Sequence, residues 1–470
     1  MRKILRLIAL ILATVPSMQA FAQSRVERAE LAKQELLDLN FFHEGRGMIT
    51  PPGLGFTGGK LSDRIVLGSL KKTLNHKFGI IVRDGLPVGL NHVEQNGIEL
   101  GALGCAICHS GKAAGVFVPG LGNKNIDIFS LAQLTLNTWS VWEKFDRARH
   151  PREQAERAIL RDRARHFLGE IANPKLHNET QGMVPTGIIR KWFFDQVGQE
   201  MDSDSRGQVK VPFLWGYGEK RKIGSFSDGF GYGVLPGWAV AVELVAGQTP
   251  DGVREYLPKI HHAEDVLGDL LPPKYPFKID MDRAAQGEKL FAQNCAGCHG
   301  TYRRDGEGLP IFEVPKFIPH HIVKTDAGRL EGGTKIFRDL VATNILSDII
   351  KGTDLGPGYM APRLEGARAR FPYLHNGSVP TLYDLLKPAS ERPVKFSLRD
   401  AGEKSRFDEK KLGLTANKSM KSLNAAAKKG DRSIYDTSKR EHGNIGHEFG
   451  FYKDLTDEDR SNIIEFVKTL

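Results

Sequence analysis

The sequence predicts a mainly α fold of two domains, with long loops and few short strands. A chain of 470 residues is too long for one hydrophobic core, and this length favours two or three domains. Apolar residues recur at helical spacing in several segments, whereas the alternating pattern of strands is weak throughout. We therefore expect the strands to be confined to short hairpins.

Residues 1–22 have the pattern of a secretory signal peptide. Arg2, Lys3 and Arg6 give a positive start to a mostly apolar stretch, and an Ala-Phe-Ala sequence ends at Ala22. We expect cleavage after Ala22 and export to the periplasm. The apolar stretch is shorter than the roughly 20 residues of a spanning helix, and no later stretch is long and apolar enough, so no membrane span is expected in the mature chain.

The remaining chain is predicted to fold as an N-terminal domain over residues 23–271 and a C-terminal domain over residues 272–470. Helical patterns such as residues 131–168 lie in the first domain. The boundary is the proline-rich sequence Leu-Pro-Pro-Lys-Tyr-Pro at 271–276, whose composition favours a stiff, extended linker.

The C-terminal domain is framed by two predicted helices. Residues 284–294 favour a helix with Gly287 and Phe291 on one face, and residues 456–470 favour a last helix with Thr456 as N-cap. Acidic residues follow Thr456, and apolar residues then recur at helical spacing. Between these helices, residues 397–440 are rich in Lys, Asp, Ser and Ala, and we expect a surface insertion there.

All four cysteines of the chain stand in two C-x-x-C-H motifs. One is Cys105-Ala-Ile-Cys108-His109, and the other is Cys295-Ala-Gly-Cys298-His299. This spacing is that of c-type haem attachment. Two thiols on one helical turn can each add to a haem vinyl group, and the adjacent histidine then lies under the iron as its proximal ligand. The motifs predict two covalently bound haem c groups, one in each domain.

Three other uses of the cysteines are less consistent with the pattern. An exported protein with four cysteines would ordinarily form disulfides, because the periplasm is oxidising. Zinc binding by two Cys-x-x-Cys pairs would not need a histidine directly after each pair. A thioredoxin-like redox pair would need a βαβ setting, and the sequence has none. We therefore predict a mainly α protein with two cytochrome c-type haem domains.

Several stretches resemble the dihaem cytochrome c peroxidase superfamily, and in particular the branch that includes the bacterial rubber oxygenases. The principal stretch is Phe-Pro-Tyr-Leu-His-Asn-Gly-Ser-Val-Pro-Thr-Leu-Tyr-Asp-Leu-Leu at 371–386. It is followed by Pro388 and by Glu-Arg-Pro at 391–393. Further segments that agree, from about residue 100 onward, are Val-Pro-Phe-Leu-Trp at 211–215, Ser-Asp-Gly at 227–229, Pro-Lys-Tyr-Pro-Phe at 273–277 and Gly-Asn-Ile-Gly-His-Glu-Phe-Gly at 443–450.

The distal ligand of each iron decides whether it only passes electrons or also binds a small molecule. For the C-terminal haem the resemblance implies His447. The alternatives are His442, which falls where the peroxidases place a methionine, and Met360, which has ordinary cytochrome c spacing.

No histidine follows His109 until His150, so the N-terminal haem lacks a nearby distal ligand downstream of its motif. His76 and His92 lie upstream, and surface or loop roles are the more economical reading for both. An open, reactive iron is what the rubber oxygenase resemblance implies. Glu94 and Glu99 are acidic residues near the motif, too weakly placed to be named as an acid or base.

Three further roles follow from the resemblance or from charge. His375 belongs to a block shared by relatives with different distal ligands, which favours a structural role beside the site. Trp215 stands where relatives have a tryptophan that helps electron transfer, and a core position at a domain contact is the alternative. Basic residues that match haem propionates by charge and position are Arg363, Arg368 and Arg370.

These features predict a periplasmic dihaem oxidoreductase, with an open N-terminal haem that binds O2 or H2O2 and a six-coordinate C-terminal haem. The alternative is a pure electron carrier with both haems six-coordinate. The expected partners are a periplasmic electron donor or acceptor protein and O2, H2O2 or an organic substrate. The net charge of +10 falls to about +7 without the signal, and no basic run with interleaved aromatics favours nucleic acid.

Overall fold

The structure is a computed structural model, and it describes part of the chain. The expected signal peptide, residues 1–22, and His150 lie outside the described residues. The described ranges are 23–39, 71–83, 86–95, 98–143, 165–176, 180–223, 227–228, 249–351, 355–416 and 418–470, with single residues at 162 and 244.

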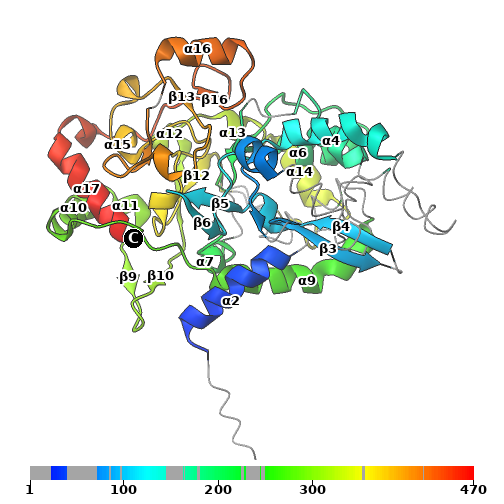
Figure 1. Cartoon of the computed structure of the whole chain (residues 1–470), viewed down its shortest axis with the longest axis horizontal. Coiled ribbons are helices and arrows are strands. Elements are labelled where there is room, and N and C mark those ends of the chain that lie inside the picture. The colour runs from blue at the N-terminus through cyan, green and yellow to red at the C-terminus, as the bar shows by residue number, and fades with distance from the viewer. Residues whose placement is uncertain are drawn as a thin grey trace, which may run out of the picture.

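Helices predominate among the described elements, and the strands are short, as the sequence predicts. Every described sheet consists of two paired strands, and the longest strands, β3 (Leu90–Gln95) and β4 (Ile98–Leu103), form a hairpin that projects at one side in Figure 1. None of the helices within the described ranges is long and apolar enough to cross a membrane.

The elements before residue 271 surround the first C-x-x-C-H motif. The other elements of this part are α2 (Arg25–Asp38), β1 (Val82–Arg83), β2 (Leu86–Pro87), η1 (Cys105–Ile107), β5 (Ser110–Ala113), β6 (Val116–Pro119), α4 (Ile128–Glu143), β7 (Met183–Pro185), α6 (Gly187–Gln196), β8 (Gln208–Lys210), α7 (Tyr217–Lys220) and α9 (Pro250–Asp269).

Helix α2 packs against α9 next to the first motif, and both helices lie along the lower edge of Figure 1. Ser24 caps α2 through a capping box with Glu27, and this arrangement satisfies amide groups that the first turn leaves unpaired. The apolar faces of the two helices enclose Cys105 and Trp215 in one buried cluster. The first motif therefore lies in a packed interior.

The elements after residue 271 surround the second motif. They are α10 (Met281–Asn294), α11 (Ala296–His299), β9 (Arg303–Arg304), β10 (Pro310–Ile311), β11 (Lys316–Pro319), α12 (His320–Val323), α13 (Gly328–Glu331), α14 (Lys335–Thr343), β12 (Gly358–Ala361), η2 (Ala367–Ala369), α15 (Leu382–Leu385), η3 (Ala389–Glu391), β13 (Lys395–Ser397), η4 (Lys404–Arg406), β14 (Phe407–Asp408), β15 (Gly413–Leu414), α16 (Met420–Lys428), β16 (Ile434–Asp436), η5 (Gly450–Lys453) and α17 (Asp457–Thr469).

The two predicted framing helices are present as α10 and α17, and they cross closely beside α11 (Figure 1). Thr456 caps α17 with Asp459, as the sequence predicts. The crossing depends on Gly287, because a Cβ atom there would lie 1.9 Å from the carbonyl oxygen of Asn462. The glycine lets the two backbones approach and places the second motif at the end of α10.

Residues 397–440 differ from the expected surface excursion. The segment is folded over β13, β14, β15, α16 and β16, and only part of it is exposed. Leu398, Ala401, Leu412 and Tyr435 are almost completely buried in the core that also contains the apolar face of α17. The apolar residues come singly or in pairs between turns, so neither helical nor strand periodicity marks them in the sequence.

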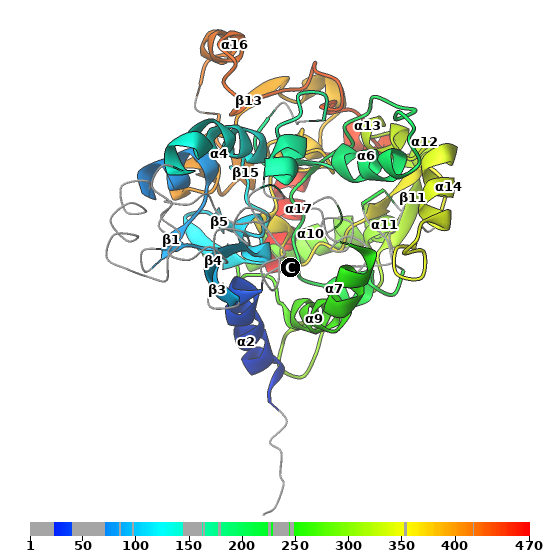
Figure 2. The same ribbon diagram turned by 90° about the vertical axis from the view of Figure 1, so that its right-hand side faces the viewer.

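The buried cluster with Cys105 and Trp215 includes Ala369, and two further buried cores contain residues from both sides of the proline-rich sequence at 271–276. One joins Met183 of β7 to the core around α17. The other packs α6 and α9 against α14, and Figure 2 shows α6 and α14 on one side of the molecule. The boundary between residues 271 and 272 stays a prediction.

Candidate functional site

The two C-x-x-C-H motifs adopt the same local turn. The amide of His109 donates to the carbonyl of Cys105 at 3.0 Å, and the amide of His299 donates to the carbonyl of Cys295 at 3.0 Å. All four cysteines are free thiols. The turn brings two thiols and an imidazole together twice in the chain.

The cysteine thiols lie in apolar surroundings. Burial raises the pKa of Cys105 and of Cys108 to about 12, and burial together with the neighbouring Cys298 raises the pKa of Cys295 to about 12. These three cysteines are therefore neutral thiols at physiological pH and differ from the low-pKa cysteines of redox catalysts.

Each motif histidine has one ring nitrogen held by a proline carbonyl. Nδ1 of His109 lies 2.9 Å from the carbonyl oxygen of Pro212, and Nδ1 of His299 lies 3.0 Å from that of Pro362. Burial lowers the pKa of His109 to about 4 and also lowers the pKa of His299. Both imidazoles are therefore neutral, with Nδ1–H donated to the backbone and the lone pair of Nε2 left for a metal.

His447 faces His299 across a short gap. The two ring centroids are 6.1 Å apart, with an interplanar angle of 52°. Nδ1 of His447 shares a hydrogen bond of 2.8 Å with the hydroxyl of Tyr452. Burial, followed by the nearby His299 and Arg392, lowers the pKa of His447 to about 3. Metal–imidazole bonds of about 2.0 Å on each side make this separation suitable for one metal ion between two Nε2 atoms.

The backbone that carries His447 is tightly held. His447 has a φ of +49°, and Gly446 before it has a φ of +76°. A Cβ atom at position 446 would lie 2.2 Å from the backbone of Lys324, so only glycine fits there. The amide of His447 donates to the carbonyl of Val323 at 2.6 Å.

Arg392 holds the same loop from the other side. Its side chain is 3% exposed, and Nη1 donates to the carbonyls of Asn444 and Gly446 at 2.6 and 2.9 Å. Nη2 donates to the carbonyl of His447 at 3.4 Å. These bonds fix the left-handed backbone that points the imidazole of His447 at His299.

The two alternative partners of His299 make other contacts. His442 is buried against Tyr435, with ring centroids 5.0 Å apart, and its Nδ1 bonds the carbonyl of Arg440 at 2.8 Å. Met360 lies in β12, paired with Phe317 of β11. Among the ring contacts of the described residues, His447 is the histidine brought to His299.

His375 packs against Tyr359 and not against either motif. The two rings are stacked with centroids 4.3 Å apart, and the Tyr359 hydroxyl lies 3.3 Å from Nε2 of His375. Burial, followed by the charges of Arg329 and Lys210, lowers the pKa of His375 to about 3. This arrangement fits the structural role expected from the sequence.

The three expected arginines lie close to the second motif. Arg363 donates to the carbonyls of His299 and Thr301 at 2.9 and 2.7 Å and pairs with Glu365 at 3.0 Å. Arg368 donates to the carbonyl of Pro273. Nη1 and Nε of Arg368 and Nη1 of Arg370 are buried without a hydrogen-bond partner. Arg363 holds backbone carbonyls beside His299, and all three arginines retain buried donors for an anionic group.

Trp215 links the surroundings of the two motifs. It is 1% exposed, and its Nε1–H donates to the carbonyl of Glu365 at 2.8 Å. Trp215 follows Pro212 by three positions, and Glu365 follows Pro362 by three positions. The prolines are those whose carbonyls bond His109 and His299. One hydrogen bond therefore joins the two short segments that support the motif histidines.

The residues expected near the first motif are only partly described. His76 is exposed beside Asp400, with Nδ1 3.5 Å from its carboxylate. Glu94 and Glu99 pair across the β3–β4 hairpin, and His92 pairs with Gly101. The side chains of His92, Glu94 and Glu99 are outside the described part of the structure.

Sequence reasoning missed the residues that hold His447. Arg392 lies in the Glu-Arg-Pro sequence that contributes to the resemblance, but nothing in the sequence assigned it a contact. Tyr452 follows His447 by five positions in a segment without regular periodicity. The roles of both depend on backbone carbonyls and ring positions that the sequence does not encode locally.

Two protein families match the C-terminal half of the chain. Residues 282–342 match the family described as cytochrome c oxidase, cbb3-type, subunit III, and this range contains the second motif. Residues 358–397 match the family described as RoxA-like, cytochrome c-like, and this range contains the Tyr-Leu-His-Asn-Gly block.

Two curated proteins of Sinorhizobium fredii are similar to the chain, and both are named only as uncharacterized. Uncharacterized protein y4iM is 33% identical over 198 residues, which cover 39% of this chain and 44% of that protein. Uncharacterized protein y4iJ is 35% identical over 269 residues, which cover 44% of this chain and 43% of that protein. The chain thus spans less than half the length of the curated relatives it matches.

Proposed function

We propose, from the premise that this chain is a RoxA-like c-type cytochrome, that it is a periplasmic dihaem oxidoreductase. Cytochrome c-type domains make it an electron-transfer haem protein with covalently bound haem c. When bound, haem supplies a redox-active iron. The proposal assigns one haem to Cys105, Cys108 and His109 and a second haem to Cys295, Cys298 and His299.

The observation that carries the proposal is the facing pair of His299 and His447, 6.1 Å apart. Both rings have Nδ1 occupied, by Pro362 and by Tyr452, so both present Nε2 to the space between them. Two neutral imidazoles saturate an iron and suit it to outer-sphere electron transfer. We therefore assign His447 as the distal ligand of the C-terminal haem, which exchanges electrons with a periplasmic partner protein.

The N-terminal haem is proposed to be the reactive one. The chain has no histidine between His109 and His150, and the relatives of rubber oxygenase type have an open position at this haem. An open position binds O2 or H2O2, and an organic compound is a further candidate substrate. His109 would hold this haem from below through Nε2, with its orientation set by Pro212.

The connection through Trp215 supports electron exchange between the two haems. The route runs from His109 to the carbonyl of Pro212, along the chain to Trp215, and across one hydrogen bond to Glu365. From there it follows the chain back to Pro362, whose carbonyl bonds His299. Only three hydrogen bonds interrupt the covalent path between the two motif histidines.

The expected export of the chain is consistent with the proposed periplasmic location. Covalent haem attachment at C-x-x-C-H motifs and an expected signal peptide over residues 1–22 both suit the periplasm. Recovery of the protein from the periplasmic fraction, with Gln23 as its first residue, tests this part of the proposal.

Three spectra of the purified protein test the function. Pyridine haemochrome absorbance is expected to give two haem c groups per chain. Electron paramagnetic resonance of the oxidised protein is expected to show one high-spin and one low-spin iron. Carbon monoxide added to the reduced protein is expected to shift the Soret band. A Soret band that carbon monoxide leaves unchanged, with two haems present, would contradict an open iron and leave a pure electron carrier.

A further inference from the structure

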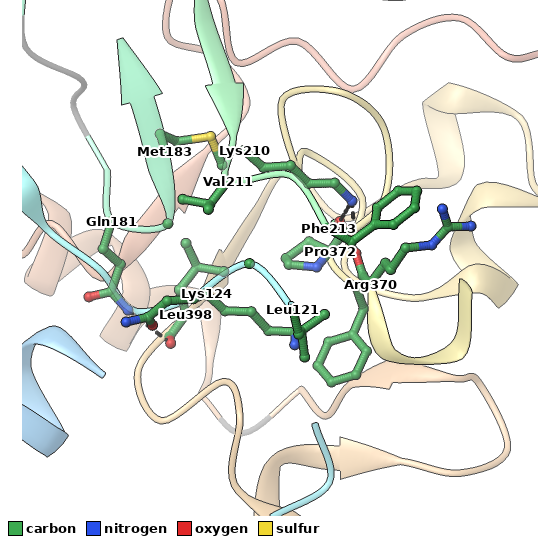
Figure 3. A pocket seen from close by; sticks show the side chains of 14 residues that line it. Leu121, Lys124, Gln181, Met183, Lys210, Val211, Phe213, Arg370, Pro372 and Leu398 are labelled. Atoms are coloured by element: carbon green, nitrogen blue, oxygen red, sulfur yellow. Dashed lines mark hydrogen bonds between the residues drawn. The ribbon is translucent and has the colours of Figure 1, made fainter. Parts of the chain in front are cut away.

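A group of buried and half-buried cations interacts with both motif histidines and has no salt bridge to a carboxylate within the described residues. Its members are Lys124, Lys210, Lys220 and Arg370. Three of them, Lys124, Lys210 and Arg370, line one pocket together with Phe213 and Phe371, and Figure 3 labels all three. We call this group the cation cluster.

The partners of these cations are neutral. Lys210 Nζ donates to the carbonyls of Arg370 and Pro372 at 2.8 and 2.7 Å, and Lys124 Nζ donates to the carbonyl of Lys112 at 3.0 Å. Lys220 Nζ lies 3.8 Å from the centroid of the Phe213 ring, and the guanidinium carbon of Arg370 lies 4.1 Å from the same centroid. Glu365, the carboxylate that acts on Arg370, is paired directly with Arg363 at 3.0 Å.

Such a group is unfavourable by itself. Burial, followed for Lys220 by the charge of Arg370, lowers the pKa of Lys124 and of Lys220 to about 7. Burial, followed by Arg370 and Lys124, lowers the pKa of Lys210 well below its usual value. Buried charges are ordinarily paired, because desolvation of an unpaired charge costs several kcal/mol. The cluster therefore indicates a negative group that the described residues do not supply.

The position of the cation cluster indicates which molecule supplies the negative group. Lys220 acts electrostatically on His109, and Arg370 acts on His299. Lys124 follows Asn123, whose amide donates to the carbonyl of Cys108 at 2.8 Å, so the cluster adjoins the first motif. Lys210 and Lys220 are half-buried. Lys210 lines the pocket together with Lys124 and Arg370. A haem held by His109 would bring two propionate carboxylates into this region of the protein.

We propose that the cation cluster is a carboxylate-binding site whose occupant is a propionate of the N-terminal haem, held by Lys210 and Lys124 with Lys220 and Arg370. This inference rests on the proposed function, because it requires a haem at the first motif. It adds lysines of β8 and of the segment after β6 to the cofactor site, beyond the arginines near the second motif. A free carboxylate ligand has the same chemistry, and the experiment separates the two sources.

Lys210→Met and Lys124→Met test the assignment in the haem-loaded protein. Each variant removes one ammonium group while keeping an unbranched apolar side chain of similar length. Lys395→Met is the matched control, because Lys395 is also half-buried but pairs with Asp436 at 3.0 Å. Resonance Raman spectra of the haem report the propionate bending bands directly, and pyridine haemochrome absorbance reports haem loading.

A shift of a propionate bending band is expected in both Lys210→Met and Lys124→Met, with none in Lys395→Met. The midpoint potential of the N-terminal haem is expected to fall in both variants, because a nearby positive charge favours the reduced iron. Unshifted propionate bands in both fully loaded variants would overturn the assignment. A saturable effect of added acetate on the wild-type spectrum that Lys210→Met abolishes would also overturn it, in favour of a free carboxylate. Absence of haem at the first motif in the wild type would instead refute the proposed function.

Discussion

The imidazole of His447 faces that of His299 at a centroid distance of 6.1 Å, although the two residues lie far apart in the chain. Arg392, Val323 and Tyr452 hold His447 in this position through two backbone carbonyls, one amide and one ring nitrogen. The pair presents two neutral imidazoles to one space, and this geometry supports the proposal that both bind the iron of the C-terminal haem.

Replacement of His447 by alanine should open the C-terminal iron. The low-spin signal of that haem in the electron paramagnetic resonance spectrum should convert to a high-spin signal, and carbon monoxide should then bind at this iron as well. His442→Ala is the control, because His442 packs against Tyr435 and not against His299. A low-spin signal that survives in His447→Ala and disappears in His442→Ala would show that His442 is the ligand.

Tyr452→Phe should raise the potential of the C-terminal haem. The change removes the hydrogen bond of 2.8 Å at Nδ1 of His447, and an imidazole that loses this bond is a weaker electron donor. A neutral hydrogen bond of about 1 kcal/mol corresponds to roughly 40 mV in a one-electron couple. Tyr435→Phe also removes a buried hydroxyl, which bonds Asn376 at 2.8 Å, and should leave the potential unchanged. Redox titration of both variants measures the midpoint potential of the C-terminal haem.

Trp215→Phe should slow electron transfer between the two haems. Phenylalanine cannot donate to the carbonyl of Glu365, so the bond that joins the two supporting segments is lost. The smaller ring in a packed core should also cost about 1–3 kcal/mol of stability. Flash reduction with detection at each haem measures the rate. Trp192→Phe, in the separate cluster with Phe193, should leave the rate unchanged, and equal rates in both variants would refute the route.

His375 should make the protein less stable as the pH falls below 6.5. Its pKa is lowered by burial to about 3 in the fold, whereas the unfolded chain has the ordinary value of 6.5. Between these values the unfolded state binds the extra proton, so stability is lost as the pH falls, by up to about 1.4 kcal/mol per pH unit. Denaturant unfolding of His375→Gln between pH 7 and pH 4 should show a smaller slope than the wild type; equal slopes would contradict the prediction.

Gly287→Ala should destabilise the crossing of α10 and α17. The added Cβ would lie 1.9 Å from the carbonyl oxygen of Asn462, so the helices must move apart, at a cost of about 1–3 kcal/mol or more. Gly268→Ala in α9 is the control, since nothing lies within 4 Å of a Cβ there and alanine favours a helix. Thermal unfolding should show a lower midpoint for the first variant only.

The helical frame of the second motif was predictable because its signals are local. The N-cap at Thr456, the apolar spacing of α17 and the glycine of α10 are each visible within a few residues, and the structure contains all three. The segment 397–440 was not predictable in the same way. Leu398 and Tyr435 contribute to the core from short strands and turns, and burial of single apolar residues leaves no periodic signal.

The sequence by itself determined where the two attachment turns lie, since each needs only five consecutive residues, two thiols and an imidazole on one helical turn. It also narrowed the partner of His299 to three side chains. Only the tertiary structure shows which of these three side chains has its ring next to that of His299. Packing between segments remote in sequence sets which nitrogen faces His299 and which carbonyls orient the two motif histidines. It also sets which cations lie near these histidines. Such contacts are set by the three-dimensional path of the backbone, and no local pattern of residues encodes that path.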